Sequence, residues 1–257
     1  MRPNRVKQLL EEGKTAWGSA LNQLRSPELP RLYAAAGLDW AFIDAEHGCY
    51  DLETVQDLIR TSLLTPLTPI VRVADLQYSL IARALDVGAE GIILPRMESP
   101  ELLERAVSWT KFPAQGVRGF GLASPHVGYQ DATFEEIVRH LNENVLVVLQ
   151  IETRKALERC DELLSVKGVN IVMVGPADLS IALGVPGQFN HPKMIEAIAG
   201  VIECCRRHGV HPGIQCRSVA MAKDWQQRGM RFIGCSSDIM FLWEKVRETV
   251  KQLRALE

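Results

Sequence analysis

Residues 146–180 read LVVLQIETRKALERCDELLSVKGVNIVMVGPADLS. Two short apolar runs rich in β-branched residues, 146–151 and 171–174, flank a longer and more polar segment. Runs of this kind predict buried parallel strands, and the segment between them predicts a covering helix. The stretch therefore predicts one β/α unit, with polar residues placed directly after each strand.

The same unit recurs along the whole chain. Eight apolar runs predict strands at residues 15–20, 40–44, 68–72, 91–94, 146–151, 171–174, 211–215 and 232–235. Segments between them, such as 52–64, 79–87, 102–110 and 194–208, carry apolar residues at helical spacing. The glycine-rich stretch GVRGFG at 116–121 predicts a loop instead of a ninth strand. Eight units in 257 residues predict a single α/β domain, residues 1–257, folded as a closed (β/α)8 TIM barrel.

The composition indicates a globular protein with small-molecule partners. With 47% apolar residues and a formal charge of -2, the chain can bury a large core but has no field to gather nucleic acid or anionic membranes. The N-terminus, MRPNRVKQLLEEGK, predicts a charged amphipathic helix and not a signal peptide, so we expect a cytoplasmic protein. The cysteines form no CxxC pair, which predicts free thiols at Cys49, Cys160, Cys204, Cys205, Cys216 and Cys235.

Polar residues follow the second and third predicted strands. FIDAEHG places Asp44, Glu46 and His47 at the end of strand 40–44, and Arg72 ends strand 68–72. Because loops at the carboxyl ends of barrel strands converge on the mouth, we expect these side chains to lie together. His47 is suited to proton transfer at neutral pH, and Arg72 to stabilising an oxyanion. The alternatives are a structural histidine and a salt bridge between Arg72 and Asp44.

Carboxylates also follow two later strands. LQIET places Gln150 and Glu152 at one strand end, and VGPADLS places Asp178 after the next strand. Two neighbouring carboxylates repel unless a proton or a cation lies between them, and oxygen ligands favour Mg²⁺ or Mn²⁺ over Zn²⁺. The alternative is that Glu152 pairs with Arg154 or Lys155 while Asp178 caps the following helix.

Taken in order, FIDAEHG, PIVRV, ALDVGAEGIILPRMES, GVRGFG, LQIET and VGPADLS resemble the HpcH/HpaI aldolase family, the class II pyruvate aldolases. The likeness covers nearly the whole chain. It implies a modified barrel whose last helix is exchanged between subunits, commonly in a hexamer built as a trimer of dimers. It also implies a carbon–carbon lyase that reversibly cleaves a 4-hydroxy-2-oxo acid to pyruvate and an aldehyde.

The resemblance assigns ligands and substrate contacts. Glu152 and Asp178 are implied to bind a divalent ion, which is Mg²⁺, Mn²⁺ or Co²⁺, and pyruvate is implied to chelate that ion through its carboxylate and keto oxygens. Gln150, the Ala177 backbone and Arg72 are implied to contact the substrate.

The resemblance also assigns the proton-transfer residues. His47 is implied to be the base, and Asp86 in the ALDVGAE segment matches a carboxylate that raises the basicity of this histidine. Asp44 matches a further polar residue near His47, and Arg72 adds a positive charge where the enolate forms.

Three alternatives to an aldolase of this type stay open. A related enzyme could use the same site to condense or decarboxylate oxaloacetate-like acids. A Schiff-base aldolase needs a desolvated lysine, for which Lys155 is the nearest candidate. A non-catalytic scaffold barrel would be expected to lose the polar rim. The sequence does not identify the aldehyde, which we expect to be bound near residues 21–25, Gln215 and Arg217.

Overall fold

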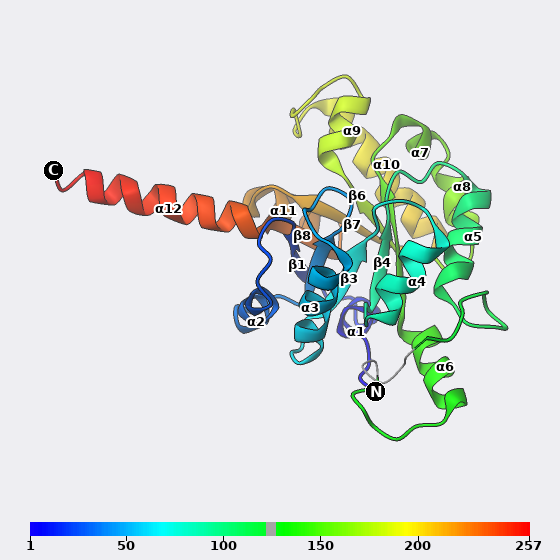
Figure 1. The fold of residues 1–257 in the computed structure, drawn as a ribbon. Helices are drawn as coiled ribbons and strands as arrows, with labels where there is room; N and C mark the ends of the chain where they lie inside the picture. The colour runs from blue at the N-terminus through cyan, green and yellow to red at the C-terminus, as the bar shows by residue number, and fades with distance from the viewer. Residues whose placement is uncertain (122–126) are drawn as a thin grey trace.

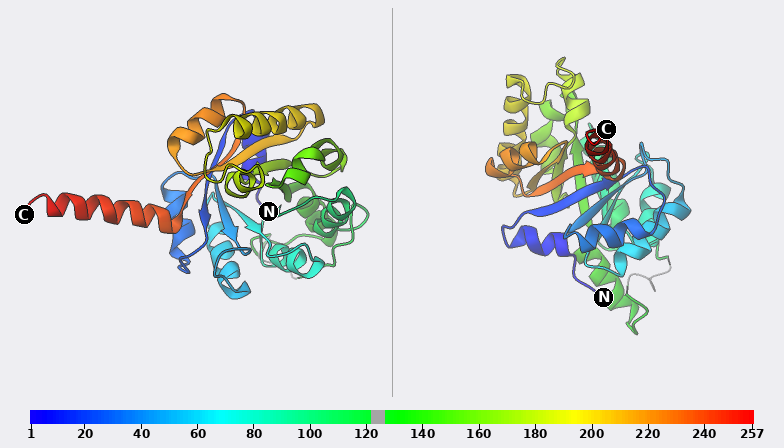
Figure 2. Two further views of the ribbon diagram at one scale, coloured as in Figure 1. Left: turned by 90° about the horizontal axis from the view of Figure 1, so that it is seen from above. Right: turned by 90° about the vertical axis from the view of Figure 1, so that its left-hand side faces the viewer.

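The fold is a closed barrel of eight parallel strands, each hydrogen-bonded to its neighbours in chain order, with β1 returning to pair with β8. The structure is a computed structural model that describes residues 1–121 and 127–257. Figures 1 and 2 show helices surrounding the barrel. The strands are β1 (Ala16–Leu21), β2 (Trp40–Asp44), β3 (Thr68–Arg72), β4 (Gly91–Leu94), β5 (Leu146–Ile151), β6 (Ile171–Val174), β7 (His211–Cys216) and β8 (Phe232–Ser237).

Most helices connect one strand to the next and cover the outside of the barrel. In the described residues they are α1 (Arg5–Glu11), α2 (Glu28–Ala35), α3 (Leu52–Leu63), α4 (Tyr78–Asp86), α5 (Pro100–Thr110), α6 (Phe134–Asn144), α7 (Arg154–Glu158), α8 (Cys160–Ser165), α9 (Pro176–Ala182), α10 (Pro192–His208), α11 (Val219–Gln227) and α12 (Asp238–Arg254).

The predicted barrel is confirmed, and β2 to β6 begin and end at the predicted residues. The strand β1 is shifted by one residue, while β7 and β8 continue beyond the predicted ends. The reason is that the polar ends of these strands still pair: Cys216 is in register with Cys235, and Ser237 with Ala20. Residues 116–121 contain no strand, as predicted.

Apolar side chains fill the inside of the barrel. Trp40 from β2 stacks on Phe232 from β8, with ring centroids 3.9 Å apart and an interplanar angle of 17°. Val6 and Leu10 from α1 join this inner cluster, so α1 closes the amino end of the barrel. A second and larger cluster lies between the strands and the outer helices. The interior is therefore packed, and the open end of the barrel is the carboxyl end.

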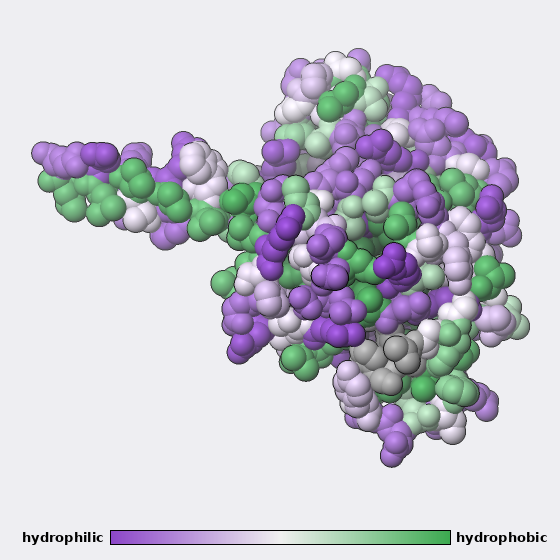
Figure 3. Space-filling model, viewed as in Figure 1, coloured by the Kyte–Doolittle hydropathy of each residue, from purple (hydrophilic) through white to green (hydrophobic). Residues whose placement is uncertain are grey.

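The helix α12 extends away from the barrel as a single projection (Figures 1 and 2). One side of it is hydrophobic along its length (Figure 3). Its exposed apolar residues include Phe241, Leu242, Trp243, Val246 and Val250. No helix in the described ranges is both long and apolar enough to span a bilayer. A cytoplasmic location stays a prediction from the sequence.

Replacement of Gly18 by alanine should destabilise the barrel. A Cβ at Gly18 would lie 2.2 Å from the Trp40 ring, and this ring is fixed by its stack on Phe232. Overpacking of this kind costs about 1–3 kcal/mol, so we expect a clear fall in the thermal unfolding midpoint. Gly200→Ala is the matched control, because Gly200 lies within α10 with no atom near its Cβ position. The control should keep or raise the midpoint, and equal midpoints for both variants would contradict this account.

Candidate functional site

A cavity of about 550 Å³ opens at the carboxyl ends of the strands. It lies where the sequence places the polar rim, because the loops after parallel strands meet at this end. The cavity wall includes the predicted site residues Asp44, His47, Arg72, Gln150, Ala177 and Asp178. Chain positions more than 130 residues apart thus meet at one site.

A buried ion pair joins the ends of β2 and β3. The Arg72 Nε and Nη2 atoms donate to the two Asp44 carboxylate oxygens, at 2.9 and 2.7 Å. Both side chains are more than 90% buried, so the carboxylate compensates a charge that would otherwise be unpaired. The predicted alternative for Arg72, a salt bridge to Asp44, is therefore present. It leaves Nη1 directed toward Gln150 Oε1 at 3.5 Å and Glu46 Oε2 at 3.1 Å.

Asp44 also shapes the turn that carries the candidate base. Its Oδ1 atom accepts the backbone N–H groups of Glu46 and His47, at 3.0 and 3.2 Å. The His47 side chain is 56% exposed at the mouth, with Nε2 3.9 Å from Glu46 Oε2. The imidazole is therefore held at the cavity by its backbone while its ring stays accessible to substrate and water.

Glu152 lies among other carboxylates. Burial raises the pKa of its carboxyl, and the negative charges of Asp178 and Glu46 raise it further, against an opposing hydrogen bond from the Arg96 N–H. Gln150 Nε2 donates to Glu152 Oε2, and Arg96 N donates to Oε1 at 3.0 Å. Negative charge dominates around Glu152, so a cation bound here would stabilise the ionised form of its carboxyl group.

The backbone beside this cluster leaves room for the carboxylate. A Cβ at Gly175 would lie 2.7 Å from Glu152 Oε2 and 2.9 Å from Gln150 Nε2, so only glycine permits this approach. Gly175 immediately precedes α9, whose first turn carries the exposed Asp178. Oxygen donors from Glu152 and Asp178 at neighbouring strand ends fit a hard divalent ion. The predicted alternative partners of Glu152 have other contacts among the described residues: Lys155 pairs with Glu98, and Arg154 donates to the Ala182 carbonyl oxygen. The N-cap residue of α9 is Gly175, and Asp178 lies in the first turn.

Arg96 is a site residue that sequence reasoning missed. It has a positive φ of 48°, which is uncommon for a residue with a side chain, and its N–H points at Glu152. Its guanidinium Nε lies 3.1 Å from Glu46 Oε1. Glu46, which the sequence predicts to lie at the mouth after β2, contacts two arginines. The Glu46 carboxylate lies between the Arg96 and Arg72 guanidinium groups. With Asp178, it is one of two carboxylates whose negative charge acts on Glu152.

The opposite wall is built around Asp238, the first residue of α12. Its Oδ2 atom accepts the backbone N–H groups of Asn22, Gln23 and Leu24, at 3.3, 3.1 and 2.8 Å. The Tyr50 hydroxyl lies 3.4 Å from the same oxygen, and burial together with Asp238 raises the pKa of Tyr50. One buried carboxylate therefore fixes the loop after β1, where residues 21–25 are expected to bind the aldehyde.

Gln215 and Arg217 line the same side of the cavity, as the sequence suggested for the aldehyde end. Gln215 Nε2 donates to the Ser236 carbonyl oxygen at 2.9 Å. The Arg217 guanidinium lies over the Phe189 ring, 5.8 Å from its centroid. The cavity thus has a charged end near Arg72 and a mixed polar and apolar end near Gln215.

Asp86 is the predicted site residue that the fold does not bring to His47 within one chain. It is the last residue of α4, which runs back toward the amino end of the barrel before β4 begins. Its Oδ1 atom accepts a hydrogen bond from Arg118 Nη2 at 2.8 Å. The sequence motif gave Asp86 its role, but spacing along the chain does not show on which end of the barrel a helix residue lies.

The sequence profile described as HpcH/HpaI aldolase/citrate lyase matches residues 22–244, most of the barrel. The chain belongs to this family. A hydroxypyruvate/pyruvate aldolase of Paraburkholderia phytofirmans is 31% identical, with 98% of each chain covered. A 4-hydroxy-2-oxo-heptane-1,7-dioate aldolase of Klebsiella pneumoniae is 33% identical, covering 93% of this chain and 89% of that protein. The crystal structure of an HpcH/HpaI aldolase from Desulfitobacterium hafniense superposes with a TM-score of 0.92 at 33% identity, covering 96% of each chain.

Membership in the HpcH/HpaI family confirms the resemblance drawn from the ordered motifs. The family match begins at Asn22, the first residue of the loop that Asp238 fixes, and ends within α12. It therefore includes both walls of the cavity.

Removal of the Asp44 charge should destabilise this HpcH/HpaI barrel. In Asp44→Asn the buried Arg72 loses its paired charge, and breaking such a pair costs about 3–5 kcal/mol. We expect a value near 3 kcal/mol, because Glu46 still lies 3.1 Å from Arg72. Urea denaturation followed by circular dichroism measures the change. Asp224→Asn is the control, since it breaks an exposed pair with Arg228 and should cost less than about 1 kcal/mol. A similar loss in both variants would show that the Arg72 pair is not specially stabilising.

Proposed function

We propose that this protein is a divalent-metal-dependent aldolase that reversibly cleaves a 4-hydroxy-2-oxo acid to pyruvate and an aldehyde. The observation that carries the proposal is the meeting of Glu152, Asp178 and the Arg72 guanidinium at one end of the cavity. Two family members, named as aldolases of hydroxypyruvate/pyruvate and of 4-hydroxy-2-oxo-heptane-1,7-dioate, support the reaction class.

Glu152 and Asp178 would hold the divalent ion. Their carboxylate oxygens suit Mg²⁺, Mn²⁺ or Co²⁺, and the fixed contacts from Arg96 N–H and Gln150 keep Glu152 in one orientation. When bound, the ion supplies a Lewis acid that stabilises negative charge on the keto oxygen of the substrate. Gln150 and the Ala177 backbone line the cavity where the pyruvate part would lie.

Arg72 would stabilise the negative charge that develops on the substrate, and His47 would transfer the proton. In cleavage, His47 accepts the proton of the C4 hydroxyl, directly or through water, and the C3–C4 bond breaks with its electron pair remaining on C3. The aldehyde leaves, the enolate of pyruvate remains beside the Arg72 cation, and protonation of C3 completes pyruvate. Arg72 is suited to this because its position is fixed by Asp44 before substrate binds.

A role for Asp86 beside His47 needs a second copy of the chain. Within one chain Asp86 pairs with Arg118 toward the amino end of the barrel, whereas His47 lies at the carboxyl end. An assembly that places the α4 end of one subunit beside the cavity of another would bring the two side chains together.

The rival reactions differ in what the cavity must contain. Condensation or decarboxylation of oxaloacetate-like acids can use the same enolate site, and the family description includes citrate lyase. A Schiff-base aldolase needs a lysine in the cavity, but no lysine of the described residues lines it, and Lys155 pairs with Glu98 at 3.4 Å. The polar rim of Asp44, Arg72 and Glu152 is intact, which disfavours a scaffold barrel.

Chelation should abolish cleavage, and metal should restore it. The assay measures pyruvate release from a panel of 4-hydroxy-2-oxo acids with EDTA-treated protein, before and after addition of Mg²⁺ or Mn²⁺. We expect cleavage only with metal, and the best substrate identifies the aldehyde. Metal-dependent exchange of the pyruvate methyl protons without cleavage of any panel member would contradict the aldolase assignment and favour the oxaloacetate alternative.

His47→Ala should lower kcat/KM for cleavage by about 10²- to 10⁴-fold, the usual contribution of a proton-transfer side chain. Its ring is 56% exposed and lies no closer than 3.9 Å to the Glu46 carboxylate in the recorded ion pair, so the thermal unfolding midpoint and Mn²⁺ affinity should stay nearly unchanged. Cys49→Ala, an exposed change two residues away, is the control and should keep full activity. Near wild-type turnover by His47→Ala would rule out the role.

We also propose that α12 packs against a second copy of this chain, in the hexamer implied by the family resemblance. Trp243 and Val250 on its apolar side are about half exposed in the part of the chain that the structure describes, and large exposed apolar patches are uncommon in monomers. Ile239 and Met240 at the start of α12 line the cavity, but Trp243 and Val250 further along the helix do not. Subunit exchange would bury Trp243 and Val250 instead.

The double variant Trp243→Glu with Val250→Glu should give a smaller assembly than the unchanged protein in size-exclusion chromatography with light scattering. Two charges on the apolar side would oppose burial against another subunit. Glu248→Lys is the control, because helical periodicity places residue 248 on the opposite side. A monomeric unchanged protein, or an unaffected mass in the double variant, would contradict the proposal.

A further inference from the structure

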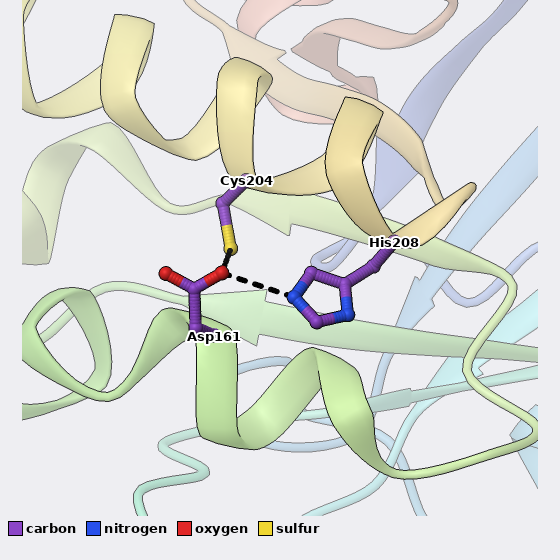
Figure 4. A group of neighbouring side chains, drawn as sticks. All are labelled: Asp161, Cys204 and His208. Carbon is purple, nitrogen blue, oxygen red and sulfur yellow. Dashed lines mark hydrogen bonds and ion pairs between the residues drawn. The ribbon is translucent and has the colours of Figure 1, made fainter.

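A second group of potential metal ligands lies on the outer helices. Asp161 comes from the first turn of α8, and Cys204 and His208 are one turn apart on the facing helix α10 (Figure 4). None of these residues lines the substrate cavity. The i, i+4 spacing places the thiol and the imidazole on one side of α10, toward Asp161.

The three side chains lie close enough together to share one metal ion. Asp161 Oδ1 lies 3.0 Å from His208 Nε2 and 3.7 Å from Cys204 Sγ, and one ligand atom from each residue lies within 4.8 Å of the others. Zinc bonds of about 2.0–2.3 Å at tetrahedral angles separate ligand atoms by about 3.3–3.7 Å. Small side-chain rotations would therefore suffice to bind an ion.

The donor set is chemically unlike the one in the cavity. Glu152 and Asp178 offer oxygen alone, whereas this group adds a thiol and an imidazole, which favour zinc and similar thiophilic ions. Cys204 is buried while Asp161 is exposed, so the group has a dry side and a solvent side where water can fill a fourth position. One thiolate and one carboxylate would neutralise a divalent ion.

Arg207 would compete with a metal ion for the Asp161 carboxylate. Its Nη2 atom lies 2.7 Å from both carboxylate oxygens, and Arg207 and His208 hold the pKa of Asp161 down to about 2. The pair is exposed, and exposed pairs contribute little. Arg207 Nη1 also lies 3.9 Å from Glu203 Oε1, which offers an alternative partner when Asp161 turns to an ion. Asp161 is thus ionised and can be released at small cost.

We propose that Asp161, Cys204 and His208 form a second metal site, separate from the catalytic one, that binds a thiophilic divalent ion such as Zn²⁺. Binding would displace one proton from the Cys204 thiol and form a metal–thiolate bond. Burial raises the pKa of Cys204, so the thiol is protonated until the ion arrives. The ion would tie α8 to α10 on the outside of the barrel, which predicts a structural role.

The absorption spectrum of bound Co²⁺ distinguishes the two metal sites. Tag-free, EDTA-treated protein is titrated with Co²⁺, and the near-ultraviolet thiolate-to-cobalt charge-transfer band is recorded. Only a site with a cysteine ligand gives this band, so oxygen ligation at Glu152 and Asp178 is silent. With the carboxylate site at Glu152 and Asp178 filled by excess Mg²⁺, we expect the band to saturate at one Co²⁺ per chain and to be lost on adding one equivalent of Zn²⁺.

Variants assign the band to its ligands. Glu152→Gln should retain it, Cys204→Ser should lose it, and Cys205→Ser is the matched control from the neighbouring buried thiol. If Cys204→Ser does not fold, Co²⁺ binding is measured instead in His208→Gln and Asp161→Asn, which change more exposed residues. Each should weaken Co²⁺ binding by more than about tenfold, the scale seen when even an outer partner of a metal site is removed. No band in the unchanged protein, or a band that persists in Cys204→Ser, would overturn the proposal.

Discussion

The ion pair between Asp44 and Arg72 is the interaction on which the candidate active site depends. It places a fixed cation at the end of β3, and the same carboxylate holds the backbone of Glu46 and His47. A buried pair of this kind is a poor source of net stability, because desolvation offsets much of the attraction. Its value here is positional: it orients the Arg72 cation and the turn that carries the proposed base His47.

The two ends of the cavity are built differently. The charged end uses residues at or just after strands β2, β3, β5 and β6, which the hydrogen-bonded barrel holds in place. The opposite end uses the loop after β1, the ends of β7 and β8, and the start of α12. The proposed metal ligands and Arg72 therefore lie at or near strand ends, whereas the end where we propose that the aldehyde binds is built from loops and from the start of α12.

The sequence predicted most of the fold and the charged end of the site. The strand Ile171–Val174 lies between Asn170 and Gly175, so its apolar run marks both ends. Residues directly after such strands lie at the mouth by topology alone. Contacts between side chains and distant parts of the chain could not be predicted from the sequence in this way. Nothing local marks Arg96 for a positive φ or Asp238 as an acceptor for a loop more than 210 residues earlier. Asp86 shows the same limit, because a motif gave it a role without showing which end of the barrel it occupies.

Asp238 connects the projecting helix α12 to the wall of the cavity. Its carboxylate fixes the loop at Asn22–Leu24 beside the cavity, while the rest of the helix extends away with its apolar side uncovered. Any force that moves α12 therefore acts directly on the wall expected to bind the aldehyde, and hardly at all on the groups around Arg72. In the proposed assembly, contacts that α12 makes with a second subunit would therefore influence the end of the cavity where we propose that the aldehyde binds.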